Sequence, residues 1–266
     1  MKLAVIGGGV MGEAIIGALL TKGIAAASDL VACDILEGRR QHLQASYGVK
    51  AVARGSEVAG GADLVLLAVK PQEFPAAGRD LNGRLTAGQT VLSIMAGVPI
   101  ARIREALKHD AVVRAIPNTP AQIGKGITLW TATSEVSEAG REAVRRVLAA
   151  LGQEIYVSEE KYIDMATAVS SSGPAYIFLV MEALVDAAVH IGFRREMAEQ
   201  MVIQTVLGSA RYAQASSRHL AELRNQVTSP AGTTTEGLLA LEKAGLRAAF
   251  IEAVQAAYDK AQRLGG

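Results

Sequence analysis

Three glycines near the start of the 266-residue chain have the spacing of a phosphate-binding loop. Gly7, Gly9 and Gly12 form G-x-G-x-x-G directly after an apolar run and at the start of a helical pattern. The first glycine permits a tight turn, the second lets the backbone approach a pyrophosphate, and the third lets the helix pack closely on the strand. The free amides at the helix N-terminus then face the anion. The pattern predicts a dinucleotide site; the alternative is a glycine-rich turn without a ligand.

An acidic residue and two arginines follow where the adenosine ribose of a dinucleotide would lie. Asp34 ends the second predicted strand, 22 residues after Gly12. A carboxylate there accepts hydrogen bonds from the ribose and repels a 2′-phosphate, which favours NAD. Arg39 and Arg40 come shortly afterwards, and a guanidinium in this place can pair with a 2′-phosphate. Exposed arginines on a helix are more often solvated, so NAD is favoured and NADP stays open.

A second cluster combines hydroxyl side chains with small residues near the C-terminal end. Residues 225–237 read NQVTSPAGTTTEG, with five hydroxyl side chains between apolar helical patterns. Ser229, Thr233 and Thr234 flank Gly232 at the predicted start of the last helix, where hydroxyls and free amides can bind a carboxylate. An ordinary helix N-cap explains the same residues equally well, so both interpretations are kept.

The elements that must position these residues alternate between strand and helix in the first half of the chain. The apolar runs at Lys2–Ile6 and Leu64–Val69 are continuous, as in strands buried on both faces. Alternation with helical stretches predicts an α/β domain, a doubly wound Rossmann-type parallel sheet with helices on both faces. In such sheets ligands lie past the carboxyl ends of the strands. Three segments there are candidates: Ala68–Pro71, Ser93–Gly97, and Arg114–Pro120 with its Asn118.

The second half of the chain is predicted to be entirely helical. Helices are expected over Tyr162–Ile191, Arg195–Gln214 and Thr234–Arg263. The shift in composition predicts a dinucleotide-binding domain at 1–160 and a helical dimerisation and substrate domain at 161–266. Helices that are apolar all round usually bury against something, so we expect a dimer; a compact monomeric bundle is the alternative.

Composition excludes several other classes of function. With 27 Lys and Arg against 26 Asp and Glu, no charge surplus favours nucleic acid. The single Cys33 and four scattered histidines predict neither a disulfide nor a metal site. The N-terminal apolar run is too short for a signal peptide, and Ile177–Val189 carries two acids and is too short for a membrane span. A cytoplasmic protein without membrane association is expected.

Five ordered blocks of the sequence resemble the pyrroline-5-carboxylate reductase family. They extend along nearly the whole chain, and the last resembles the segment before the family's final long helix. The blocks are GGGVMG (7–12), AVKPQ (68–72), RAIPNTP (114–120), SSSGPAY (170–176) and LRNQVTSPAGTTTEGL (223–238).

This resemblance implies a reaction, a cofactor and a set of site residues. The family transfers a hydride from NADPH or NADH to the cyclic imine 1-pyrroline-5-carboxylate, which gives L-proline in the last step of its biosynthesis. It also buries its helical domain in an intertwined homodimer, often stacked into a ring. The matching cofactor positions are Gly7, Gly8, Gly9, Val10, Met11, Gly12, Ala68, Val69, Lys70 and Ala96. The matching substrate-carboxylate positions are Ser229, Gly232, Thr233 and Thr234, with Thr234 nearest the imine nitrogen and assigned the catalytic contact.

The chain departs from the family pattern at five positions. They are Val10 for Asn, Leu220 for Pro, Asn225 for Asp, Ala231 for Gly and Thr235 for an aliphatic residue. Ala231 matters most, because its methyl group would shift the substrate loop if that position needs a positive φ.

The residue types also suggest how such a reaction proceeds, and they argue against two alternative functions. A cyclic imine can enter already protonated, which fits the absence of a lysine or a histidine–carboxylate pair from the SSSGPAY and TSPAGTT blocks. Catalysis would then depend on positioning, with Thr234 hydrogen-bonded to the nitrogen. A β-hydroxyacid dehydrogenase would need a lysine after SSSGP, and residues 175–194 contain none. A non-catalytic cofactor sensor would have no reason to keep PNTP and TSPAGTT.

Overall fold

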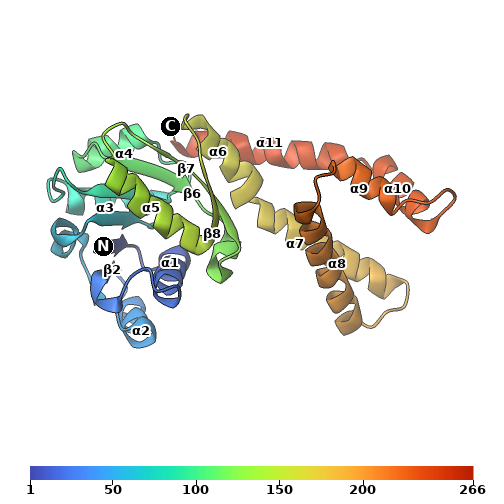
Figure 1. The fold of residues 1–266 in the computed structure, drawn as a ribbon, viewed down its shortest axis with the longest axis horizontal. Coiled ribbons are helices and arrows are strands. Elements are labelled where there is room, and N and C mark those ends of the chain that lie inside the picture. The colour runs from blue at the N-terminus through green and yellow to red at the C-terminus, as the bar shows by residue number, and fades with distance from the viewer. Residues whose placement is uncertain (266) are drawn as a thin grey trace. The chain divides into compact units, whose positions relative to one another are not determined.

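The computed structural model of the chain describes residues 1–265, which group into two compact units (Figure 1). One unit combines Met1–Ser172 with Ala256–Gly266, and the other is Gly173–Gln255. The predicted division at residue 160 separates a dinucleotide-binding domain from a dimerisation and substrate domain. This assignment of functions stays a prediction.

The first unit contains a single sheet which, within residues 1–265, has eight strands in the order β3-β2-β1-β4-β5-β6-β7-β8. Neighbouring strands are parallel from β3 to β6, β7 is antiparallel to β6, and β8 is parallel to β7. Chain order reverses on either side of β1, which is where doubly wound sheets bind ligands. The strands are β1 Leu3–Ile6, β2 Leu30–Cys33, β3 Lys50–Val52, β4 Leu64–Leu67, β5 Thr90–Ser93, β6 Val112–Ile116, β7 Gly126–Ala132 and β8 Gly152–Tyr156.

Helices cover both faces of this sheet, because alternate strand residues point into two separate apolar cores. Leu3 and Val5 of β1 belong to the core formed with α1, α2 and α5, whereas Ala4 and Ile6 belong to the core formed with α3 and α4. This arrangement confirms the predicted α/β class. The helices are α1 Val10–Thr21, α2 Glu37–Tyr47, α3 Phe74–Leu81, α4 Ile100–Leu107, α5 Glu138–Leu151 and α6 Lys161–Ala166.

The β7–α5–β8 segment was not among the predicted elements. It adds two strands after β6, and β7 turns back antiparallel instead of continuing the parallel pattern. Its helix α5 supplies Val144, Val147 and Leu148 to the same core as α1. A reversal of strand direction depends on how the chain packs after β6, and an alternating pattern does not encode it.

The second unit consists of helices. Val185 of one helix packs against Ala198 and Val202 of the next and forms a small core. The elements are α7 Gly173–His190, α8 Arg195–Ala215, α9 Leu220–Gln226, α10 Thr233–Lys243 and α11 Leu246–Gly265, whose last residues group with the first unit.

Two predicted helices differ from those observed. The expected helix Thr234–Arg263 is two helices, α10 and α11, because Gly245 between them adopts a left-handed conformation with φ 74°. The predicted helix Tyr162–Ile191 is present, but it contains one turn of π-helix at Thr167–Ser171.

The length of this helix corrects the prediction that the apolar stretch Ile177–Val189 is too short to cross a bilayer. Lys161–His190 is helical over 30 residues, with a mean hydropathy of 1.4 in its most apolar window, and only 11% of that window is buried. Length and composition therefore suffice for a membrane span, although a core helix of a soluble protein passes the same test.

The loop after β5 packs against the C-terminal end of the chain. Gly97 has φ 71°, and a Cβ at this position would lie 2.6 Å from Cβ of Leu264. Positive φ and close approach both require glycine here. The predicted ligand segment Ser93–Gly97 is thus held by the last turns of α11.

Candidate active site

A large cavity of the first unit lies at the carboxyl ends of the strands, next to the glycine loop. Its volume is about 750 Å³, and most of its lining is apolar. The predicted cofactor residues that line it are Gly7, Gly9, Val10, Asp34, Ala68, Val69 and Lys70. The structure therefore brings together segments from three strand ends, β1, β2 and β4, as the parallel topology requires.

The glycines of the loop differ in what requires them. Gly7 has φ 105°, and a Cβ there would lie 2.7 Å from the backbone of Ala68; a Cβ at Gly12 would collide with the carbonyl oxygen of Gly7. Gly9 has an ordinary φ of −69°, and a Cβ there would meet nothing within 4 Å. The fold itself therefore requires Gly7 and Gly12. Gly9 leaves open space in the cavity at the N-terminus of α1, where an anionic group fits.

Asp34 is tied to the loop through its side chain. One carboxylate oxygen accepts a hydrogen bond from the amide of Gly8 at 2.9 Å, and the other accepts from the amide of Leu36 at 2.9 Å. A carboxylate has about four acceptor positions, so each oxygen keeps capacity for a further donor. Asp34 is thereby oriented at the end of β2 and remains able to accept from hydroxyl groups in the cavity.

A cluster around Glu13 joins α1 to α2, and sequence reasoning did not find it. The Glu13 carboxylate accepts from Arg39 at 2.5 Å, from His42 at 2.7 Å and from Tyr47 at 3.0 Å. Burial opposes ionisation, but the hydrogen bonds from Arg39, His42 and Tyr47 lower the pKa of Glu13 to about 2. Two features of the sequence could have indicated this cluster. Glu13 is an acid in the first helical turn after the glycine loop, and the three residues Arg39, His42 and Tyr47 lie on one face of the next helix.

Cys33 also lines the cavity, and its thiol is unreactive. Burial, followed by the charges of Asp80 and Asp34, raises the pKa of the thiol to about 12. A protonated thiol is a poor nucleophile, so Cys33 serves as apolar wall. This agrees with a site built for binding rather than for covalent catalysis.

Five predicted cofactor residues do not line this cavity: Gly8, Met11, Gly12, Ala96 and Asn118. Met11 is half-buried against the core shared by α1 and α5, and Gly12 is buried in the strand–helix contact. Ala96 packs against Ile116 with α6. Gly8 contributes its amide to Asp34 instead.

Asn118 has an internal role in the structure. Its side-chain amide donates to the carbonyl of Ser170 at 3.1 Å, and its side-chain oxygen accepts from the amide of Ile127 at 3.0 Å. These bonds connect the loop after β6 to β7 and to the π-helical turn. A cofactor contact of Asn118 stays a prediction.

The predicted substrate residues lie in the second unit, at the start of α10. Gly232 is the N-cap of this helix, so the amides of Thr233 and Thr234 are at its free N-terminus. The Thr235 hydroxyl donates to the carbonyl of Ser229 at 2.8 Å. Among residues 1–265 the Thr234 hydroxyl makes no hydrogen bond to protein. The segment therefore offers free donors, although their use by a ligand stays a prediction.

Ala231 occupies a backbone conformation that disfavours side chains. It has φ 56°, and it is the third residue of a turn closed by the Gly232 amide and the Ser229 carbonyl at 3.0 Å. A turn with proline in its second position and a positive φ in its third ordinarily has glycine there. The condition under which the methyl group of Ala231 would matter, a positive φ, is therefore met, and Ala231 is strained.

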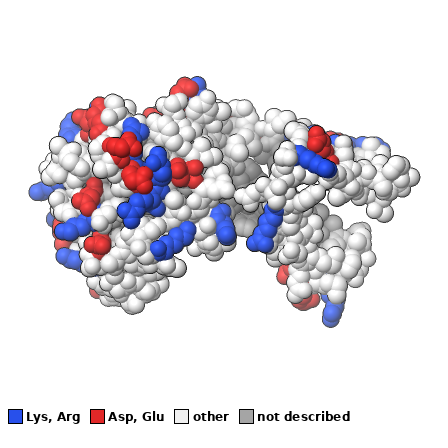
Figure 2. Space-filling model, in the orientation of Figure 1, with Lys and Arg blue, Asp and Glu red and all other residues white. Residues whose placement is uncertain are grey.

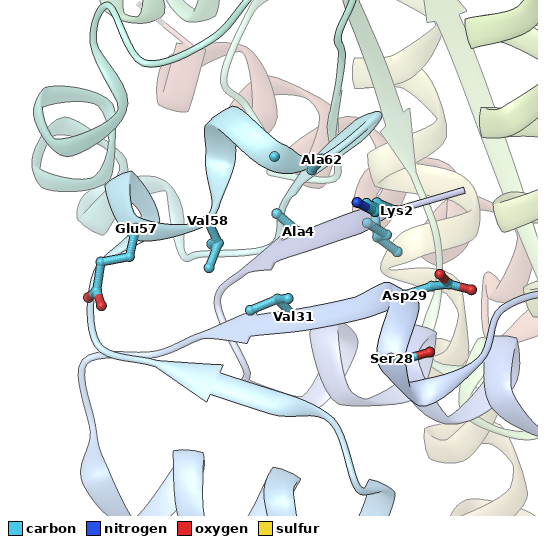
Figure 3. A pocket seen from close by; sticks show the side chains of 10 residues that line it. Lys2, Ala4, Ser28, Asp29, Val31, Glu57, Val58 and Ala62 are labelled. Carbon is cyan, nitrogen blue, oxygen red and sulfur yellow. The ribbon is translucent and has the colours of Figure 1, made fainter.

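A second cavity, of about 180 Å³, lies near the amino ends of β1 and β2 (Figure 3). Lys2, Ser28 and Asp29 from these ends surround it, together with Glu57 and Val58. None of the predicted site residues lines it, and parallel sheets bind ligands at the opposite ends of their strands. We therefore assign it no function.

Charge on the molecular surface is mixed. In the view of Figure 2, Lys, Arg, Asp and Glu are interspersed over the first unit, and the helices of the second unit present few charged side chains. This fits the near-zero net charge, and within residues 1–265 no cluster of three or more potential metal ligands occurs.

Comparison with known proteins assigns both halves of the chain. Residues 160–264 match the family described as "Pyrroline-5-carboxylate reductase dimerisation", and residues 2–97 match "NADP oxidoreductase coenzyme F420-dependent". A pyrroline-5-carboxylate reductase from Synechocystis is 39% identical over 265 residues, which cover 100% of this chain and 98% of the relative.

Solved structures give the same assignment. A pyrroline-5-carboxylate reductase from Coxiella burnetii has 35% identity and a TM-score of 0.91, covering 100% of this chain and 98% of that one. A pyrroline carboxylate reductase from Plasmodium falciparum, solved with NADP bound, has 28% identity and a TM-score of 0.92 with the same coverage. Full-length similarity, together with the glycine loop at a strand-end cavity and the hydroxyl-rich start of α10, places this chain in the pyrroline-5-carboxylate reductase family.

Proposed function

We propose that this chain reduces the cyclic imine 1-pyrroline-5-carboxylate to L-proline with NADPH or NADH, the last step of proline biosynthesis. The observation that carries the proposal is Gly9, which neither backbone conformation nor packing requires and which opens the cavity at the N-terminus of α1. Family membership supplies the reaction.

The residues present fit a nicotinamide dinucleotide. The amides at the start of α1 would hold the pyrophosphate, Asp34 would accept from the adenosine ribose, and Ala68, Val69 and Lys70 would border the cofactor after β4. When bound, NAD(P)H supplies the hydride. Val10, with 64% of its surface exposed, adds an apolar contact where the family has Asn.

The start of α10 would hold the substrate. The amides of Thr233 and Thr234 at the helix N-terminus attract a carboxylate, and the Ser229 hydroxyl lies directly over Gly232. The Thr234 hydroxyl, uncommitted among the described residues, would accept a hydrogen bond from the protonated imine nitrogen. Because that nitrogen already carries its proton, the chain needs to orient the substrate rather than donate a proton.

Turnover with purified protein tests this proposal. Loss of the reduced-nicotinamide absorbance with 1-pyrroline-5-carboxylate is expected with at least one of NADH and NADPH. Thr234→Ala is expected to lower kcat by about tenfold or more, since one hydrogen bond made in the transition state is lost. Thr228→Ala is the matched control, because the Thr228 hydroxyl donates to the carbonyl of Arg224 in the same segment. Full activity of Thr234→Ala would refute its role.

The family's dimerisation region covers the helical part of this chain, and we propose that it forms an intertwined homodimer, stacked further into a ring. The domain division would then be a dinucleotide-binding part at 1–160 and a helical dimerisation and substrate part at 161–266. Exposed apolar side chains support this: Phe178 is 62% exposed, Leu179 65% and Ile251 72% in the single chain. Burial in a dimer would also explain the apolar Lys161–His190 helix in a cytoplasmic protein that does not enter membranes.

Light scattering without detergent tests the assembly. A mass of two chains or a multiple of two is expected. Aggregation that only detergent relieves would instead support a membrane role for Lys161–His190.

A further inference from the structure

Glu13 lies in the first turn of α1 and fastens one face of α2 to it. Its carboxylate accepts from Arg39, His42 and Tyr47, all of which belong to α2. The Glu13 side chain is only 22% exposed, and that of Arg39 is 32% exposed. The pair is therefore partly shielded from water, which strengthens it relative to an exposed ion pair.

Arg39 lines the cofactor cavity, but its charge is already compensated. Its Nη2 contacts Glu13 at 2.5 Å, and both Nη2 and Nε donate to the carbonyl of Gly8 in the glycine loop. A bidentate contact with a 2′-phosphate uses two guanidinium nitrogens, of which Nη2 is always one, so it would compete with the bonds from Nη2 to Glu13 and Gly8. Losing the partner of a half-buried carboxylate costs free energy, and this cost would oppose phosphate binding.

Two further arginines lie near Asp34 or in the cavity wall: Arg54 lines the cavity, whereas Arg40 does not. Arg40 donates to the carbonyls of Asp34 and Ile35, each at 2.9 Å. Arg54 donates to Asp80 at 3.3 Å. The carboxylate of Asp34 meanwhile faces the ribose position with acceptor capacity to spare. In the cavity, a 2′-phosphate would therefore meet the unpaired carboxylate of Asp34, while Arg39 and Arg54 are each paired with an acid.

Resting on the proposed function, we propose that Glu13 is a specificity-determining residue. Because Glu13 holds Arg39, the guanidinium does not bind a 2′-phosphate. Together with the repulsion from Asp34, this makes the site select NADH over NADPH. Glu13 itself touches no cofactor atom in this proposal and acts as a positioning residue through Arg39.

Calorimetric binding of NAD⁺ and NADP⁺, which differ only in the 2′-phosphate, tests this without turnover. The wild-type protein should bind NAD⁺ at least about tenfold more tightly. Tighter binding of NADP⁺ would overturn the specificity while leaving the proposed function intact. Binding of neither nucleotide would overturn the dinucleotide-binding function itself, and this proposal with it.

Glu13→Gln removes the charge that holds Arg39. We expect NADP⁺ to bind about fivefold more tightly than to wild type and NAD⁺ to change by less than about twofold. Adding Arg39→Ala to this variant should abolish the gain, which separates a freed guanidinium from a general change of charge. An unchanged ratio of the two dissociation constants in a folded Glu13→Gln protein would contradict the proposal.

Two further variants keep the test decisive. Glu37→Gln is the matched control, since Glu37 is an exposed acid at the start of α2 that bonds Gln41 and not Arg39, and its ratio should equal wild type. Arg39→Ala alone should change the ratio by less than about threefold. A loss of NADP⁺ affinity of about tenfold in Arg39→Ala would show that Arg39 already reads the 2′-phosphate, against the proposal, even if Glu13→Gln failed to fold.

Discussion

The sheet-containing unit and the helical unit differ in where their apolar side chains go. In the first, β4 and β5 are buried along their whole length between two cores. In the second, the buried residues form one small cluster around Val185, and large apolar side chains such as Phe178 and Leu179 are more than half exposed. The first unit carries its own core; the second has a core too small for its apolar surface and depends on further burial.

The largest expected effect comes from charging the helical unit. Leu179→Glu places a carboxylate where the proposed dimer would bury a leucine, and we expect monomers and a Tm lower by about 10 °C or more. Ile123→Glu is the counterpart in the sheet-containing unit, where Ile123 is 76% exposed. It should leave mass and Tm nearly unchanged. Light scattering measures the mass of each variant and calorimetry its Tm. Equal changes in the two variants would contradict the difference between the units.

A large effect is also expected inside the self-contained unit. Arg114 of β6 is 1% exposed and pairs with Glu160 at 2.7 Å and Asp164 at 2.5 Å, which fastens the start of α6 to the sheet. Arg114→Met leaves two carboxylates without their partner and should lower the free energy of unfolding by about 3 to 5 kcal/mol. The exposed pair Arg104–Asp110 gives the control, since Arg104→Met should lower the free energy of unfolding much less than Arg114→Met does. Urea denaturation compares the free energies of unfolding of the two variants. Equal decreases would contradict the role of Arg114 in fastening α6 to the sheet.

The Glu13 cluster gives a smaller, pH-dependent effect. The pKa of Glu13 in the folded protein is about 2, below the ordinary value of 4.5, so the stabilisation is fully present above about pH 4.5 and is lost as pH falls toward 2. Glu13→Gln should therefore be less stable than wild type by about 1 to 2 kcal/mol at pH 7, allowing for solvent screening. The difference should shrink between pH 4.5 and 2 in denaturation curves. A difference independent of pH would mean that Glu13 acts by packing alone.

The smallest effects come from two left-handed residues, one in each unit. Ala231→Gly and Lys108→Gly both relieve a positive φ, of 56° and 53°, and each should stabilise by up to about 1 kcal/mol, partly offset by the greater freedom of glycine when unfolded. Only Ala231→Gly should also change KM for the imine, because Ala231 borders the proposed substrate loop. A KM change in Lys108→Gly, at the end of α4, would remove this distinction.

Much of the first unit was predictable because its signals are local. Glycine spacing and continuous apolar runs identified β1, the start of α1, the end of β2, and β4 within a few residues. The family assignment also followed from short ordered blocks, and the full-length relatives confirm it. The reversal at β7 and the break at Gly245 were missed, since each depends on packing or on a single backbone conformation. The assignment of individual site residues stays a prediction.

The amino-acid sequence by itself determined the doubly wound class, the phosphate loop and the family, because each is written in neighbouring residues whose spacing constrains the backbone. Only the tertiary structure decided that Arg39 belongs to Glu13, that Arg114 joins Glu160 and Asp164, and that Ala231 is left-handed. Pairings of side chains 26 to 50 residues apart depend on how strands and helices come together. The sequence shows which residues are charged, whereas the fold determines which partner compensates each charge.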